Sequence, residues 1–305
     1  TQYTVTLRSA VSGNIATTNG GATLTSNRTA SSSTMTGLTI AYQINTGYAT
    51  ATIGTGWGAG PWSRGTWGSG YTTGFDLQLR LWSQSNFGEN LIFAYRGGPI
   101  CYWYASTGTS VRGVLLENEV GASDVPTVVN DVFVSDTSRF VFAFGCNELG
   151  GSTLDPMLVR WSNQEDPLMW TPEATNQAGS LRLSHGSEII TALQSRQEIL
   201  VWTDAAVYSL QYVGAPIVWS AQLVGDNISI VGQNAVAFAN GVSYWMGKDK
   251  FYMYDGRTQP LSCDLRRYVF EDINTSQFEQ VFAGTNEGFH EVWWFYCSAD
   301  SNTVD

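Results

Sequence analysis

The clearest indication of the fold of this 305-residue chain is the stretch Ala235-Val-Ala-Phe-Ala-Asn-Gly-Val-Ser-Tyr-Trp-Met-Gly-Lys-Asp-Lys-Phe-Tyr-Met-Tyr-Asp-Gly256. It holds three short runs rich in apolar and aromatic residues, the pattern of β-strands. Asn240-Gly241 supplies the two positive-φ positions of a type I′ hairpin turn. The polar segment 248–250 and Asp255-Gly256 indicate two more turns. The stretch therefore predicts three antiparallel strands in one meander.

Weaker copies of this meander occur at 132–161, 189–212 and 281–296. Tryptophans recur along the same region at Trp103, Trp161, Trp202, Trp245 and the Trp293-Trp294 pair. Their successive intervals are 58, 41, 43 and 48 residues. The later intervals bracket the period of roughly 40–50 residues that is typical of a four-stranded β-propeller blade. We therefore expect an all-β chain in which residues 76–305 form propeller blades.

The composition changes near Phe75-Asp76. Residues 1–75 contain no Asp or Glu and three arginines, whereas residues 76–305 contain all 26 acidic residues and 12 basic ones. Residues 1–50 alternate Ser or Thr with apolar residues around Asn19-Gly-Gly21, which predicts a small β module or insertion. Residues 51–75 form a Gly/Trp-rich connector. The chain starts without Met and stops just after a strand-like run, so we expect a piece of a longer polypeptide whose propeller is incomplete.

The formal charge of −11 argues against tight binding to a nucleic-acid backbone, because such binding needs clustered Lys and Arg. It does not exclude a surface along which DNA slides. No apolar stretch approaches the roughly 18 residues that a membrane-spanning helix needs, so we expect no membrane partner. Four cysteines lie far apart without a C-x-x-C pair, at Cys101, Cys146, Cys263 and Cys297. We expect buried free thiols and a reducing cytoplasm, and long-range disulfides in a secreted protein are the alternative.

Neither histidine lies in a catalytic motif. His185 occupies a turn-like Ser-His-Gly-Ser sequence without a G-x-S-x-G elbow, and His290 lies at a hairpin edge. The carboxylate neighbours Glu117 with Glu119 and Glu165 with Asp166 fall in polar turns, where solvation disfavours a catalytic acid. The spacing supports no metal site. We therefore predict a chain that is not an enzyme, with no catalytic, cofactor-binding or metal-binding residue.

The segment 54–70 places Trp57, Trp62 and Trp67 five residues apart among glycines. These indoles need an apolar surface to cover them. They could contact a partner or stack on sugar rings, and they could equally fill a core between the small module and the propeller. They are the candidate partner-contact residues of this chain.

Several ordered motifs resemble virion structural proteins of tailed bacteriophages, of the tail-nozzle or packaged-DNA-stabilising type. They are Gly54-Thr-Gly-Trp-Gly-Ala-Gly-Pro-Trp62, Leu81-Trp-Ser-Gln-Ser-Asn-Phe-Gly-Glu-Asn-Leu91, Phe142-Ala-Phe-Gly-Cys-Asn147, Asp155-Pro-Met-Leu-Val-Arg-Trp-Ser-Asn-Gln-Glu165 and Phe251-Tyr-Met-Tyr-Asp-Gly256. The resemblance implies a β-propeller whose copies ring the channel below the portal, retain packaged DNA and let it pass during ejection. It implies no catalytic residue.

The leading hypothesis is therefore a virion component of the tail or neck, assembled in the host cytoplasm as a homo-oligomeric ring. Its partners would be copies of itself and other tail, portal or neck proteins, with DNA passing transiently and without sequence-specific binding. The alternative is a secreted carbohydrate-binding or glycan-cleaving β-propeller that uses the connector tryptophans as a sugar platform.

Overall fold

A computed structural model of the chain describes Thr6–Leu7, Asn14–Thr18, Gly21–Thr25, Ile40–Ala41 and residues 79–304. The chain divides into two compact units, Thr1–Ala49 and Thr50–Asp305. Within the described ranges, no helix has both the length and the apolar character needed to cross a membrane.

The first unit contains short antiparallel strands. Strand β1 (Thr6–Leu7) pairs with β4 (Ile40–Ala41), and β2 (Asn14–Thr18) pairs with β3 (Gly21–Thr25). In the β2–β3 pair, Thr18 lies opposite Gly21. The predicted turn residues Asn19 and Gly20 lie outside the described residues.

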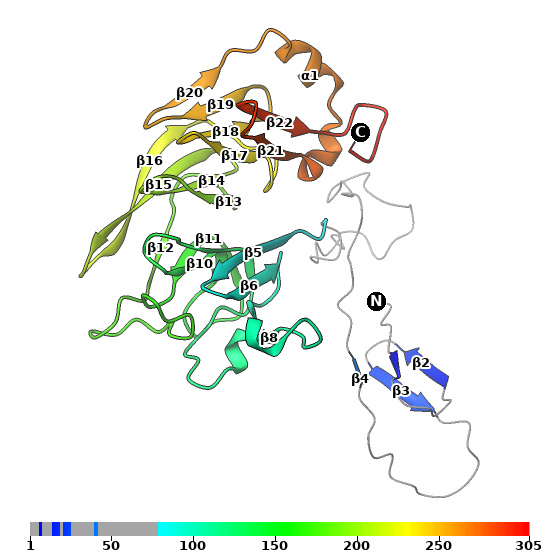
Figure 1. Cartoon of the computed structure of the whole chain (residues 1–305), viewed down its shortest axis with the longest axis vertical. Helices are drawn as coiled ribbons and strands as arrows, with labels where there is room; N and C mark the ends of the chain where they lie inside the picture. The colour runs from blue at the N-terminus through cyan, green and yellow to red at the C-terminus, as the bar shows by residue number, and fades with distance from the viewer. Residues whose placement is uncertain (1–5, 8–13, 19–20, 26–39, 42–78, 305) are drawn as a thin grey trace, which may run out of the picture. The chain divides into compact units, whose positions relative to one another are not determined.

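The second unit consists of five antiparallel sheets that follow one another along the chain (Figure 1). The first sheet contains β5 (Trp82–Phe87), β6 (Asn90–Tyr95), β7 (Cys101–Trp103) and β8 (Val114–Leu115). The second contains β9 (Val129–Val134), β10 (Val141–Asn147), β11 (Leu154–Trp161) and β12 (Gly179–Arg182). The third contains β13 (Ile189–Gln194), β14 (Ile199–Thr203), β15 (Ala206–Gly214) and β16 (Val218–Asp226). The fourth contains β17 (Val236–Ala239), β18 (Val242–Met246), β19 (Phe251–Tyr254) and β20 (Thr258–Leu261). The fifth contains only β21 (Phe282–Asn286) and β22 (Glu291–Phe295).

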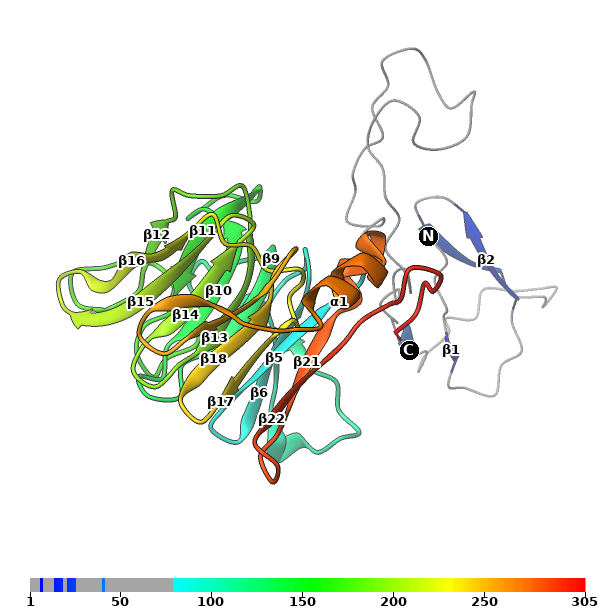
Figure 2. The same ribbon diagram turned by 90° about the horizontal axis from the view of Figure 1, so that it is seen from above.

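Helical segments in the described region are short. They are the 3-10 turns η2 (Ala105–Thr107), η3 (Leu116–Asn118) and η4 (Thr275–Gln280) and the single α-helix α1 (Arg266–Asp272). Helix α1 lies outside the sheets, where Phe270 packs 5.3 Å from the ring of Phe251 (Figure 2). This helix was not among the elements predicted from the sequence.

The meander at 235–256 is confirmed. Asn240 and Gly241 have φ values of 51° and 83°, so both hold the left-handed conformation that the type I′ turn requires. The three expected strands are β17, β18 and β19, and a fourth, β20, completes the sheet. The fourth strand escaped prediction because Pro260 interrupts its short run.

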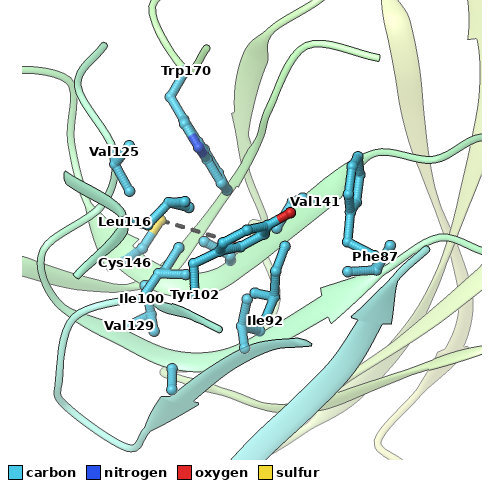
Figure 3. Packing of buried hydrophobic residues seen from close by; sticks show 14 of the residues in the cluster. Phe87, Ile92, Ile100, Tyr102, Leu116, Val125, Val129, Val141, Cys146 and Trp170 are labelled. Carbon is cyan, nitrogen blue, oxygen red and sulfur yellow. Dashed lines mark hydrogen bonds between the residues drawn. The ribbon is translucent and has the colours of Figure 1, made fainter. Parts of the chain in front are cut away.

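The first two hydrophobic cores each lie between two consecutive sheets, and the third joins the third, fourth and fifth sheets. Strand β10 is buried along its whole length, because Val141 and Ala143 face the first sheet while Phe142 faces the third. Figure 3 shows the first of these cores, in which Ile92 and Tyr102 pack near Val141 and Trp170. Side chains that alternate between two neighbouring cores are what sheets stacked face to face require.

The first strands of several neighbouring sheets contact one another. Strand β5 contacts β9, β9 contacts β13, and β17 contacts β21. Four-stranded meanders packed face to face around their first strands define a β-propeller, so the predicted fold class is confirmed. The fifth sheet has two strands rather than four, so the last blade is incomplete within the described region.

The tryptophans used to find the repeat occupy two different strands of the blade. Trp202, Trp245 and Trp294 occupy second strands and lie opposite the first strand of their own sheets. Trp103 and Trp161 lie in third strands instead. The regular interval thus reports a true repeat only from the third sheet onward, because only there does the indole fill the same place between sheets.

Candidate functional site

A cavity of about 220 Å³ is lined by strands and turns of the first four sheets and by η4, which precedes the fifth. Its walls come from Arg96, Asn130, Leu154, Pro156, Glu188, Ile189, Ile190, Asp204, Ile230, Val231, Gly232, Gln233, Lys248 and Glu279. We call it the axial cavity. It is the candidate site because it brings together charged side chains from segments far apart in the sequence.

An ion pair joins the first and last sheets beside this cavity. The Arg96 Nη1 atom lies 2.6 Å from Glu279 Oε1, although the two residues are 183 positions apart in sequence. Arg96 follows β6, and Glu279 lies in η4 just before β21. The other carboxylate oxygen of Glu279, Oε2, is buried without a hydrogen-bond partner among the described residues. The pair therefore joins the two ends of the propeller across the axis.

The pKa values of Glu188 and Asp204, two carboxylates beside the cavity, shift in opposite directions. Burial raises the pKa of Glu188, and the nearby charge of Asp204 adds to this rise. Burial alone would also raise the pKa of Asp204, but hydrogen bonds from Ser187 and from the Glu188 amide outweigh it and lower the pKa. The Ser187 Oγ and N atoms lie 2.6 Å and 2.7 Å from the Asp204 carboxylate. Asp204 is thus held as an anion.

The cavity combines two cations, Arg96 and Lys248, with the three carboxylates of Glu188, Asp204 and Glu279. Gln233, which also lines the cavity, is 8% exposed. The lining contains no Ser, Cys or His side chain that could act as a nucleophile. A site of this kind can hold water or a small polar molecule, and its charges fix the relative positions of the blades.

A second buried acid lies where three sheets meet. Asp131 on β9 is 5% exposed, and its Oδ2 atom accepts hydrogen bonds at 3.3 Å from Thr191 Oγ1 and Ala192 N on β13. Burial raises the pKa of Asp131 to about 6, against the opposing effect of hydrogen bonds that include one from Ser83 on β5. This carboxylate therefore lies at a junction between blades.

The histidines lie apart, in different sheets. His185 precedes β13, and its ring Nδ1 is 3.3 Å from Ser184 Oγ, while its backbone N–H donates to the Tyr208 hydroxyl. The ring of His290, in the β21–β22 turn, lies 3.4 Å from Asn240 Nδ2. Neither ring has a carboxylate partner among the described residues.

The carboxylate neighbours also lie in loops, as expected. Glu119 accepts a hydrogen bond from the Tyr104 hydroxyl at 2.8 Å, which raises the pKa of that phenol to about 12. Glu165 lies 3.9 Å from the Arg139 guanidinium at the surface. Within residues 79–304 and the described strands before them, no group of three His, Cys, Asp or Glu side chains could hold a metal ion.

All four cysteines are free thiols. Cys101, Cys146 and Cys297 are buried and Cys263 is partly exposed. The three candidate partner-contact residues, Trp57, Trp62 and Trp67, lie outside the described residues, as does the whole connector 51–75.

Sequence reasoning missed the axial cavity entirely. Arg96, Glu188, Gln233 and Glu279 lie in four different turns or loops with no shared motif. One signal was available, since the polar turn 248–250 contains Lys248. Its place beside the axis could not be known before the sheets were assembled.

No family model matches the chain, and no curated protein matches it. Among solved structures it is similar to the extracellular domain of a putative hybrid two-component system from B. thetaiotaomicron, at 12% identity and a TM-score of 0.44, covering 73% of this chain and 26% of that one. It is also similar to BBS1N in complex with ARL6DN, at 9% identity and a TM-score of 0.42, covering 73% and 62%. A third is Hsv2 from Kluyveromyces marxianus, at 10% identity and a TM-score of 0.37, covering 73% and 59%. The chain spans less than two thirds of each of these structures.

Proposed function

We propose that this chain is a non-enzymatic structural component of a tailed-bacteriophage virion. Copies of it would form a ring in the tail nozzle or neck, around the channel that retains and releases packaged DNA. The observation that carries the proposal is the set of ordered motifs between residues 54 and 256 that resemble such proteins. The β-propeller fold that the resemblance implies is the fold of this chain.

The motifs of the second sheet support a scaffolding role. The motif 142–147 forms most of β10, the fully buried strand between two cores. Its Asn147 side chain accepts hydrogen bonds from Thr127 N and Val128 N at 2.9 Å and 3.1 Å. In the motif 155–165, Arg160 is 2% exposed and lies 2.6 Å from Asp124 Oδ2. These residues hold loops and strands in place, as expected of a protein whose role is its shape.

The axial cavity constrains where DNA would pass. Its volume is only about 220 Å³. A DNA duplex has a major groove that is itself about 12 Å wide, so it cannot pass through the axis of one propeller. The channel would therefore lie between copies, in the centre of a ring.

The charge of the propeller region suits such a channel. Residues 76–305 carry 26 acidic and 12 basic side chains, and a predominantly acidic surface repels the phosphate backbone. DNA would then slide past without adhering. We expect the assembly to bind duplex DNA weakly at physiological salt and with a shallow salt dependence. Tight binding with a steep salt slope would contradict this mechanism.

The location can be tested directly. An antibody raised against residues 79–304 should label the tail or neck of phage particles that encode the chain, and electron microscopy of the purified protein should show rings. If purified particles of a phage that encodes the chain do not contain it, the proposal is refuted. Saccharide binding by the purified chain that is lost when Trp57, Trp62 or Trp67 is replaced by alanine would favour the carbohydrate-binding alternative.

A further inference from the structure

The hairpin of β15 and β16 projects beyond the sheets around it. Both strands have nine residues, and the first five of β15 are buried while the next three are exposed. Figures 1 and 2 both show the hairpin extending away from the body of the propeller. Four large apolar side chains are exposed along its outer part, namely Tyr212 (43%), Val213 (53%), Ile217 (65%) and Leu223 (38%). We call residues 212–223 the hairpin tip.

The hairpin tip is held in a defined shape. The rings of Tyr212 and Trp219 lie 5.4 Å apart edge to face, and Phe140 of the second sheet lies 5.8 Å from Tyr212. The Tyr212 hydroxyl donates to Gln177 Oε1 at 3.0 Å. A firmly supported apolar projection of this kind is typical of a protein-binding element, because ordering it on binding costs little entropy.

The hairpin also lacks charge. Residues 205–225 contain no Asp, Glu, Lys or Arg, although the chain as a whole carries a formal charge of −11. Two copies of such an acidic chain repel each other unless they meet through uncharged surfaces. The hairpin therefore offers a route by which one copy can approach another.

A second apolar surface lies on the incomplete fifth sheet, and the carboxylate of Glu291 at its edge accepts a hydrogen bond from Trp293 Nε1 at 3.0 Å. Phe282, Trp293 and Phe295 share one face of β21 and β22, because Phe282 lies opposite Phe295 and Gly284 opposite Trp293. Phe282 and Phe295 stack at 4.7 Å, and Phe282 and Trp293 are 41% and 50% exposed. We call these three residues the aromatic face.

The aromatic face is hollowed at its centre. A groove of about 230 Å³ is lined by Gly284, Thr285, Asn286, Trp293 and Phe295. A Cβ atom added at Gly284 would have no neighbour within 4 Å, so the missing side chain leaves open space beside Trp293. The opposite face of the sheet is already covered, since Trp294 packs 4.9 Å from Phe251. The groove can thus receive an aliphatic side chain from outside.

We propose that the hairpin tip of one copy docks in the groove of the aromatic face of the next copy, with Ile217 seated beside Trp293. The hairpin tip and the β21–β22 hairpin lie on different sides of the propeller in Figures 1 and 2, so the tip of one copy does not reach the groove of that same copy. A contact between two different surfaces is head-to-tail, and it closes into a ring when the rotation allows. The inference deepens the proposed function, since it rests on the ring and names the surfaces that build it.

Two charge substitutions test the contact. Ile217→Asp disables the tip and Trp293→Asp disables the groove, and both sites are at least half exposed, so the fold should survive. Leu149→Asp is the matched control, because Leu149 is 54% exposed in the β10–β11 turn, away from both surfaces. Circular dichroism and thermal melting check that each variant is folded. Sedimentation then measures association, which each of the first two variants should weaken at least about 30-fold while the control leaves it unchanged.

Mixing the two disabled variants tests the head-to-tail geometry. Each variant keeps one intact surface, so an equimolar mixture should form a 1:1 dimer and nothing larger, while each variant alone stays monomeric. A tip that paired with a tip would instead leave Trp293→Asp able to dimerise by itself.

Three results would overturn the proposal: a wild-type chain that stays monomeric at about 100 µM, variants that associate as the wild type does, or a mixture that stays monomeric. The experiment uses only purified protein, so its outcome is separate from whether the chain is found in virions.

Discussion

Replacing Asp131 with asparagine should change how the stability of the propeller depends on pH. Asparagine keeps an oxygen that can accept the hydrogen bonds of Thr191 and Ala192, but it cannot ionise. Burial raises the pKa of the native carboxyl from 3.8 to about 6. Between these values the folded protein holds a proton that the unfolded chain has lost, so the stability of the wild type falls as pH rises.

The magnitude follows from the size of the shift. A rise of about two pKa units, at 1.36 kcal/mol per unit, corresponds to about 3 kcal/mol. The free energy of unfolding of the wild type, relative to that of Asp131→Asn, should therefore fall by about 2 kcal/mol between pH 4 and pH 7, since part of the total is already lost at pH 4. Most of the change should occur below pH 6, and the asparagine variant should be the more stable protein at neutral pH.

Urea unfolding followed by tryptophan fluorescence, repeated across this pH range for both proteins, measures the difference. Buried Trp170, Trp202 and Trp245 make the signal report on the propeller. Asp136→Asn, at an exposed site just after β9, shows what the loss of a surface charge does by itself. A difference between wild type and Asp131→Asn that stays constant from pH 4 to pH 7, or that grows in favour of the wild type, would refute the reasoning.

Three further predictions concern the ion pairs and thiols. Arg96→Met should destabilise the protein by about 1–3 kcal/mol, because it leaves the partly buried carboxylate of Glu279 unpaired. In a Glu279→Gln background the same substitution should cost less free energy of unfolding. Equal costs in the two backgrounds would show that the pair does not link the sheets. Arg160→Met should lower the free energy of unfolding, measured in a thermal or urea melt, by about 3–5 kcal/mol, because it removes a fully buried partner from a carboxylate and two carbonyls. A loss under about 1 kcal/mol would contradict this. At pH 8 a thiol reagent should modify the partly exposed Cys263 in the native protein, whereas Cys146, whose pKa burial raises to about 12, should react only after unfolding; mass spectrometry of the labelled peptides distinguishes them.

Much of the strand pattern was readable from the chain, because it depends on neighbours in sequence. The hairpin at Asn240-Gly241 forms where its dipeptide predicts it. Strand β10 reads as a continuous apolar run because sheets cover both of its faces. The fourth strand of the sheet that contains the Asn240-Gly241 hairpin, β20, was not predicted because of Pro260. Proline is rare inside a strand except at the edge of a sheet, where β20 lies.

The candidate site could not be read in the same way. Arg96 and Glu279 meet across 183 residues, and Asp131 acquires its raised pKa from strands of the sheets on either side. These relations depend on how whole sheets stack. Turn chemistry and period-two patterning contain no information about that.

Local sequence patterns predict that this protein is built of β meanders, with turns at its Gly, Asn and Asp pairs and an acidic propeller region after residue 75. These properties follow from backbone conformation and composition, which act over a few residues. The packing of the sheets establishes which tryptophans are equivalent and which carboxylates are buried away from water. It also establishes that the uncharged hairpin at 205–225 projects while the face of β21 and β22 stays open. Burial and exposure are set by contacts between sheets distant in sequence, so the same side chain can fill a core or form a surface without any change in its local pattern.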